Sequence, residues 1–328
     1  MKTLIVKPVE PLSLTAAPIT SYDIFSYVST LSTPLPTTVI GFIGAALGVK
    51  LVSKDPMEGF EELVNSVKER LKCEDPVIIG PLVFFKVDGS MRGPTIPVRN
   101  KLFVHLSSII KTTLGYNIKC SECFEYKPLV MTGIALKRRA PGEEKSVRKG
   151  YMYKYPLVTC RERGTGKVAE PFFIYVLNCE VALDKKVIRV GGESRVAEVY
   201  VTTEKLFVEY ASKLTNPLKT LQRGVYVAVS PIPLLHAQVD GLYLDNTLGL
   251  EFVRGVEGVI GVPQEGDKPP KIIVERLGLG FYEVKGVRRP QILVLPPGTL
   301  VKVETPSISL PTMFKLLYTI GFSSLFPT

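Results

Sequence analysis

The chain has 328 residues, of which 45% are hydrophobic and 22% charged, with 27 glycines and 26 prolines. This length excludes a disulfide-stapled miniprotein, and the composition predicts a folded chain with frequent turns. The net charge of +10 favours a polyanionic partner and leaves RNA, DNA and anionic lipid open.

The N-terminal part of the chain predicts a short strand followed by two helices. Residues 3–9 have the pattern of the strand, and residues 11–34, rich in Ser, Thr and Pro, that of an ordered surface loop. From Thr37, apolar residues at helical spacing and several small residues predict a well-buried helix. Residues 57–71 have the period of an amphipathic surface helix that begins near Asp55.

The rest of the chain is predominantly strand-like. Runs of β-branched and aromatic residues predict strands at residues 77–87, 129–136, 172–183, 196–201, 225–229, 271–274 and 292–303. Further helices are predicted at residues 102–114, 204–214 and 311–320. Because helices do not alternate regularly with strands, the fold class is predicted as α+β. The apolar run at residues 313–326 is consistent with either core or a docking surface.

The cysteines and the apolar runs bear on where the protein works. Five cysteines at irregular spacing fit a reducing compartment better than a disulfide framework. The longest apolar run, residues 39–49, is too short to cross a membrane as a helix, and the N-terminus does not match a signal peptide. We therefore expect a cytoplasmic protein without membrane contact. Cys120 and Cys123 form one C-x-x-C pair, but zinc needs four ligands, so we expect incidental cysteines and no metal.

The positive charge is concentrated in residues 131–170, which hold ten basic and four acidic residues, a net +6. Tyr151, Tyr153 and Tyr155 alternate there, so a strand would place the three rings on one face. Basic residues interleaved with aromatic rings suit a surface that binds single-stranded nucleic acid. The competing interpretation is a solvated loop followed by a strand whose tyrosines pack inward.

No motif predicts a catalytic site. Residues 164–167 resemble part of a phosphate-binding loop, but Arg161 stands where the first glycine is required and Val168 where a Mg²⁺-binding Ser or Thr is required. His105, between two apolar residues, is interpreted as a half-buried imidazole, and His236 is the only other histidine. So few histidines weaken but do not exclude metal-independent RNase chemistry.

Two glycine motifs indicate backbone that can approach a phosphate closely. Gly191 and Gly192 form a double-glycine turn flanked by Arg189 and Arg195, and both arginines can reach phosphates. Glu193 does not favour an anion, so we assign it to fixing the loop, by pairing with an arginine or accepting backbone N–H bonds.

The second motif has the spacing glycine, hydrophobic, glycine, five residues, glycine. It consists of Gly278, Gly280 and Gly286, with Leu279 as the hydrophobic residue. An ordinary turn between strands has the same composition, so this motif alone is weak evidence.

Taken together, these residues resemble the RAMP superfamily of CRISPR effector proteins. The resemblance rests on the N-terminal strand, the helix sequence P-T-T-V-I-G-F-I-G-A-A-L-G at residues 36–48, the G-G-E-x-R loop at 191–195 and the glycine motif at 278–286, in that order. The chain most resembles the RAMP group that contains the third subunit of the type III-B (Cmr) complex. A same-group subunit of another CRISPR type would share these features.

The resemblance implies two ferredoxin-like (RRM-like) domains with long insertions. We expect them at residues 1–185, with the basic insertion at 131–170, and at residues 186–328. The resemblance further implies binding of the 5′ repeat-derived tag of the guide RNA and indirect contact with target RNA. It implies a place between the large polymerase-like subunit and the backbone RAMP subunits in antiviral defence.

We therefore expect a non-catalytic RNA-binding subunit without a cofactor. The residues expected to bind RNA are Lys137, Arg138, Arg139, Arg148, Lys149, Arg161, Arg163, Lys167, Arg189, Gly191, Gly192, Arg195, Gly278, Gly280 and Gly286. One alternative is a metal-independent guide-RNA-processing endoribonuclease of the same superfamily. Another is a structural bridge whose basic face meets an acidic partner surface.

Overall fold

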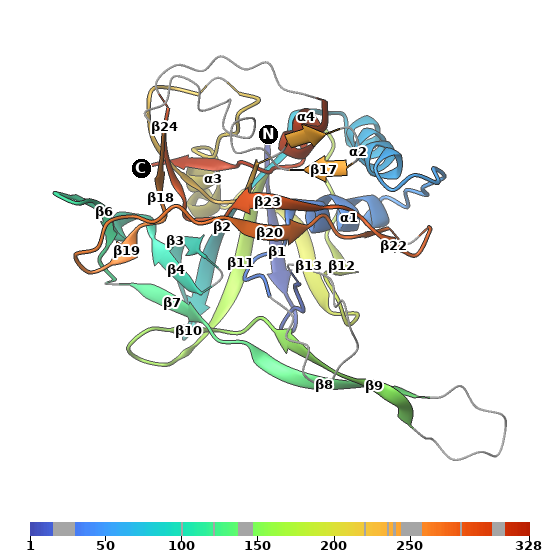
Figure 1. The fold of residues 1–328 in the computed structure, drawn as a ribbon, viewed down its shortest axis with the longest axis horizontal. Helices are drawn as coiled ribbons and strands as arrows, with labels where there is room; N and C mark the ends of the chain where they lie inside the picture. The colour runs from blue at the N-terminus through green and yellow to red at the C-terminus, as the bar shows by residue number, and fades with distance from the viewer. Residues whose placement is uncertain are drawn as a thin grey trace.

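A nine-stranded sheet of antiparallel neighbours runs through the centre of the molecule (Figure 1). In spatial order its strands are β10 (Cys160–Glu162), β7 (Cys123–Tyr126), β4 (Leu102–His105), β3 (Ser90–Val98), β2 (Cys73–Val87), β11 (Val168–Cys179), β1 (Lys2–Pro8), β13 (Val196–Thr202) and β12 (Lys186–Arg189). The computed structural model describes residues 1–15, 30–99, 101–120, 122–136, 147–219, 221–234, 236–238, 241–243, 258–282, 284–303 and 312–328.

Smaller sheets and a few helices surround the central sheet, so the fold is mixed and dominated by strands. A four-stranded sheet contains β18 (Gly258–Gly261), β24 (Leu300–Val303), β14 (Gly224–Ala228) and β25 (Leu325–Pro327). Two three-stranded sheets contain β15 (Ile232–Leu234), β23 (Gln291–Leu295) and β20 (Glu275–Gly278), and β19 (Gln264–Glu265), β6 (Gly115–Ile118) and β5 (Ile109–Thr112). Three pairs are β16 (His236–Gln238) with β17 (Gly241–Tyr243), β21 (Phe281–Tyr282) with β22 (Val287–Arg288), and β8 (Leu129–Leu136) with β9 (Val147–Leu157). The helices are α1 (Pro36–Ala46), α2 (Glu58–Leu71), α3 (Lys205–Ala211) and α4 (Thr312–Thr319), with a 3₁₀ turn η1 (Leu106–Ser108).

Apolar side chains on both faces of the central sheet form the core. Successive side chains of a strand point to opposite faces, so Leu4 and Val6 of β1 join one cluster and Ile5 joins another. Helices α1 and α2 and strands β20 and β23 contribute to the first cluster, and α3 contributes to the second. Strand β20 and α1 therefore lie over the same face of the sheet.

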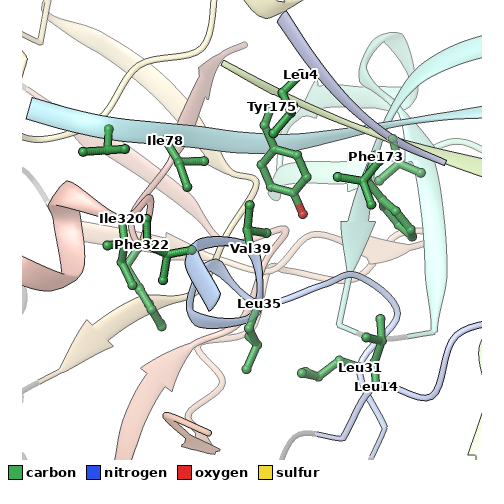
Figure 2. Packing of buried hydrophobic residues seen from close by; sticks show 14 of the residues in the cluster. Leu4, Leu14, Leu31, Leu35, Val39, Ile78, Phe173, Tyr175, Ile320 and Phe322 are labelled. Carbon is green, nitrogen blue, oxygen red and sulfur yellow. The ribbon is translucent and has the colours of Figure 1, made fainter. Parts of the chain in front are cut away.

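The predicted buried helix is confirmed as α1. Leu35 and Val39 lie among core residues that include Tyr175 of β11 and Phe322 near the C-terminus (Figure 2). The Tyr175 hydroxyl donates to the carbonyl of Pro34 at 3.3 Å, and burial raises the pKa of this phenol well above its ordinary value. These contacts fix the position of the N-terminus of α1 relative to the sheet.

The predicted amphipathic helix is confirmed as α2. The carboxylate of Asp55 accepts hydrogen bonds from the N–H groups of Met57 at 2.7 Å and Glu58 at 2.9 Å, which satisfies two free donors at the helix start. The helix ends at Lys72, whose φ of 50° is left-handed and stops the helical repeat.

Several sequence predictions are wrong. Residues 102–114 form β4, η1 and β5 and not a helix, because β4 pairs with β3 and β7 and buries Phe103 and Val104 completely. Residues 292–303 form two strands separated by a turn in which Gly298 has a φ of 89°. The strand expected at 271–274 begins instead at Glu275.

Two segments of open burial are settled by packing. The apolar run near the C-terminus belongs to the core, since Leu317, Tyr318 and Phe322 are fully buried. The segment expected as a surface loop at residues 11–34 is described only at its two ends, and there Leu12, Leu14 and their neighbours are buried.

The cysteines depart from expectation, because four of them form disulfides. Cys73 and Cys179 lie directly opposite each other on the neighbouring strands β2 and β11, with 3.9 Å between their Cα atoms. Cys120 and Cys123 form the second disulfide, which corrects the expectation of incidental thiols. Cys160 is a buried free thiol. The sequence could not reveal the first pair because its members are 106 residues apart.

The expected domain boundary at residue 185 falls between two members of the central sheet, since β12 and β13 follow it and β11 precedes it. The division into two domains stays a prediction. None of the helices in the described part of the chain is long and apolar enough to span a bilayer.

Candidate nucleic-acid interface

Three segments that are far apart in the sequence meet at one groove of about 870 Å³. They are the start of α1, the double-glycine turn between β12 and β13, and the corner between β20 and β21. Residues 13–15 complete the wall. The motifs that carry the sequence resemblance therefore converge in space.

The N-terminus of α1 opens onto this groove. Thr37 and Thr38 line the groove, and the residue before the helix, Leu35, has no side chain that can cap it. The first N–H groups of a helix have no intrahelical partner, and the helix dipole makes this end partially positive. No acidic residue lies in the first turn. An anion such as a phosphate is therefore favoured at this end.

The double-glycine turn packs tightly against the chain's own backbone. Gly191 has a φ of 77°, and a Cβ atom at this position would overlap the carbonyl oxygen of Ser13. The N–H of Gly192 donates to the same oxygen at 2.8 Å. This N–H is thus already engaged, and the turn contributes to the groove mainly by its shape. Glu193 and Ser194, which follow the turn, both have left-handed φ values, 57° and 55°.

The two arginines beside the turn have different surroundings. Arg189 lines the groove and is exposed at the end of β12. Arg195 pairs instead with Glu10, and its side chain is only 19% exposed. Hydrogen bonding to Glu10, with a further contribution from Tyr155, raises the pKa of Arg195. Arg195 is not among the groove residues and holds the turn against the N-terminal strand.

The second glycine motif divides between the groove and a nearby turn. Gly278 and Gly280 line the groove, and Gly280 has a φ of 102° at the corner between β20 and β21. Leu279 between them is fully buried and anchors the corner in the core. Gly286, with a φ of 63°, lies in the turn from β21 to β22 and outside the groove lining.

Arg289 is a groove residue that the sequence reasoning missed. Its guanidinium lies over the rings of Phe60, at 5.0 Å, and Tyr282, at 5.4 Å, and donates to the carbonyl of Phe281 at 3.2 Å. Burial lowers the pKa of this guanidinium, which nevertheless stays charged. The backbone N–H of Arg289 donates to the carbonyl of Gly280 at 2.9 Å, so the β21–β22 hairpin brings the two residues together. An arginine at the far end of a hairpin that starts at the glycine corner was the available signal.

The charge of the groove is positive. Its described lining includes Arg189 and Arg289 and no aspartate or glutamate. Apolar side chains from α1, α2 and the glycine corner form much of the remaining wall, together with threonine and serine hydroxyls. Cations, a helix N-terminus and apolar surface together suit a phosphate-linked chain of bases.

The basic segment at 131–170 does not line the groove in the described residues. Lys137, Arg138 and Arg139 lie outside the described residues. Arg148 and Lys149 belong to β9, in a hairpin that extends away from the body (Figure 1), but their side chains are likewise not described.

The remaining basic residues of this segment have partners at the edge of the central sheet. Arg161 donates to the carbonyl of Gly166 at 2.9 Å. Lys167 pairs with Asp88 at 2.6 Å, and this contact raises the pKa of the lysine. Arg163 pairs with two glutamates and lines a different cavity.

Catalytic geometry is not evident at the described histidine. The Nδ1 atom of His105 lies 2.7 Å from the hydroxyl of Ser107, within a local turn. His236 lies in β16, and its side chain is not described. Among the described residues no three His, Cys, Asp or Glu side chains are grouped to hold a metal ion. The absence of catalysis and of a metal stays a prediction.

Comparison with known proteins reveals a shared fold. No family model and no curated protein sequence matches the chain. A chain in a cryo-EM structure of the Type III-B Cmr-beta bound to cognate target RNA and AMPPnP is similar, with a TM-score of 0.63, 18% identity and coverage of 99% of this chain and 96% of that chain. A chain in a structure of the Type III-B Cmr-beta bound to cognate target RNA has a TM-score of 0.59, 17% identity and the same coverage.

Proposed function

We propose that the protein is a non-catalytic RNA-binding subunit of a cytoplasmic type III-B (Cmr) CRISPR effector complex. In this proposal the groove holds the 5′ repeat-derived tag of the guide RNA. The subunit bridges the large polymerase-like subunit and the backbone RAMP subunits. The observation that carries the proposal is the convergence of the three RAMP-like segments, at 36–48, 191–195 and 278–286, around one groove whose described lining has no carboxylate.

The arrangement of the central strands supports the same family. In the order β13-β1-β11-β2, each strand is antiparallel to its neighbour, and α1 and α2 connect β1 to β2. This is the strand order of a ferredoxin-like sheet. The return from β11 to β13 passes through β12 and not through a helix, which is a departure from that plan.

The test is RNA binding by the purified chain as a function of salt. Fluorescence anisotropy with a labelled RNA that carries a repeat-derived 5′ tag should give an affinity that falls steeply as salt rises, because phosphate contacts release counterions. The variant R189Q/R289Q should lower the slope of log K against log salt by about 1.4, since each lost contact on a single strand contributes about 0.7.

The control is K205Q/K213Q, which removes the same charge from exposed lysines at α3, on the other side of the sheet. It should bind RNA like the parent. No RNA affinity at any salt would refute the proposal and favour a purely structural bridge. Cleavage of repeat RNA in EDTA that is lost in H105A or H236A would favour the endoribonuclease alternative.

A further inference from the structure

A second cavity, of about 900 Å³, lies next to the proposed RNA groove. Leu31 lines both spaces, and β20 borders both: Leu277 lines the cavity, and Gly278 lines the groove. The strand has four residues and so spans roughly 13 Å. A single short strand of RNA can therefore occupy both spaces.

The cations of this cavity outnumber its available carboxylates. Arg163 forms ion pairs with Glu125, at 3.4 Å, and with Glu265, and Lys127 also approaches Glu125 at 3.3 Å. These four side chains balance one another.

The remaining charged residues of the lining are Arg99, Lys101 and Arg276, with one carboxylate, Glu275. Burial raises the pKa of Glu275, while the nearby Arg99 and Lys101 oppose this rise. The cavity therefore carries a net positive charge that is not cancelled by ion pairs between the described residues.

Arg99 is held in an unusual conformation at the cavity wall. Its φ is 58°, a left-handed value that is rare for arginine, and its N–H donates to the carbonyl of Pro297 at 3.3 Å. The Nε atom of Arg99 is buried and has no hydrogen-bond partner among the described residues. Left-handed backbone and unsatisfied buried donors are both costly, and such costs are concentrated at functional sites.

The cavity also offers a fixed aromatic ring. Tyr126 lines it, and the hydroxyl of this tyrosine donates to the hydroxyl of Thr30 at 2.8 Å, which restrains the ring. Leu102 and Leu277 add apolar wall. Aromatic rings next to cations bind bases by stacking while the cations bind phosphates.

We propose that this cavity binds the RNA strand where it leaves the groove, with Arg99, Lys101 and Arg276 contacting its phosphates and Tyr126 stacking on a base. The inference rests on the proposed function, because it takes the groove as the first binding site. The path of the strand crosses β20 between the two spaces. Glu275 is then a residue that weakens binding, since its carboxylate faces the same phosphates.

The experiment compares short and long RNA. Oligoribonucleotides of about four to about sixteen nucleotides, the usual range of site sizes on single-strand-binding folds, are titrated against the purified chain. The variant K101Q/R276Q changes two exposed side chains and should bind long RNA about tenfold more weakly. Its slope of log K against log salt should fall by about 1.4 on long RNA. Short RNA that fills only the groove should bind unchanged.

A second variant gives a change of opposite sign. E275Q keeps the shape of the side chain and removes its charge, so it should strengthen the binding of long RNA while leaving short RNA unaffected. The charge-matched control is again K205Q/K213Q, and thermal melting checks that every variant is folded.

The outcomes separate the two proposals. If K101Q/R276Q and E275Q bind long RNA like the control while R189Q/R289Q binds all RNA weakly, the cavity proposal is overturned and the groove remains. If wild-type protein binds neither short nor long RNA, the proposed function itself fails.

Discussion

Replacing Gly191 with alanine tests whether the double-glycine turn shapes the groove through its contact with the N-terminal strand. The Cβ atom of an alanine would overlap the carbonyl oxygen of Ser13, a backbone atom that cannot rotate away. The φ of 77° adds the cost of a left-handed alanine, on the order of 1 kcal/mol. Separating the two segments also breaks the hydrogen bond from Gly192 to Ser13, which contributes about 1 kcal/mol.

The sum predicts a loss of about 2 to 3 kcal/mol in the free energy of unfolding, allowing for partial relaxation. The assay is urea denaturation followed by circular dichroism. The matched control is Gly166→Ala, since Gly166 has a similar φ of 70° with nothing within 4 Å of its added Cβ, and it should lose only the backbone cost of about 1 kcal/mol. Equal losses for the two variants would refute the role of the close contact with Ser13.

Two further predictions concern the cysteines. Removing the Cys73–Cys179 disulfide with a C73S/C179S variant should cost about 4 to 5 kcal/mol of stability, because it closes a loop with a sequence separation of 106, whereas C120S/C123S should cost about 2 kcal/mol; denaturant unfolding measures both, and equal costs would contradict the loop argument. Burial raises the pKa of the Cys160 thiol from 9.0 to about 12, so the folded state holds this proton more tightly than the unfolded state. The contribution of Cys160 to stability should be constant below about pH 9 and fall as the pH rises from 9 toward 12, and subtracting the unfolding curves of C160A isolates it. A stability difference between wild type and C160A that does not change over this window would contradict the burial of the thiol.

Local sequence patterns predicted the elements that have strong periodicity of their own. The apolar spacing from Thr37 and the charge pattern of residues 57–71 identified α1 and α2, and the β-branched run at 129–136 matches β8. Residues 102–114 were mispredicted because strand pairing with distant segments overrides a helical spacing of apolar residues.

The functional residues divide in the same way. The motifs at 191–195 and 278–286 were visible as glycine patterns, but the partners of their side chains were not. Arg195 pairs with Glu10, which is 185 residues away, and this removes it from the groove. Arg289 enters the groove only because a hairpin returns it to Gly280.

By itself, the sequence determined the positive charge, the strand-rich composition and the glycine turns, since these depend on residue type and short-range conformation. Tertiary structure alone decided which of the cations stand beside those turns. The net +6 of residues 131–170 suggested the interface, yet Arg161 and Lys167 of that segment have partners elsewhere, and Arg189 and Arg289 line the groove. Contacts between residues that are a hundred or more positions apart depend on how sheets and hairpins pack, and no local pattern records that packing.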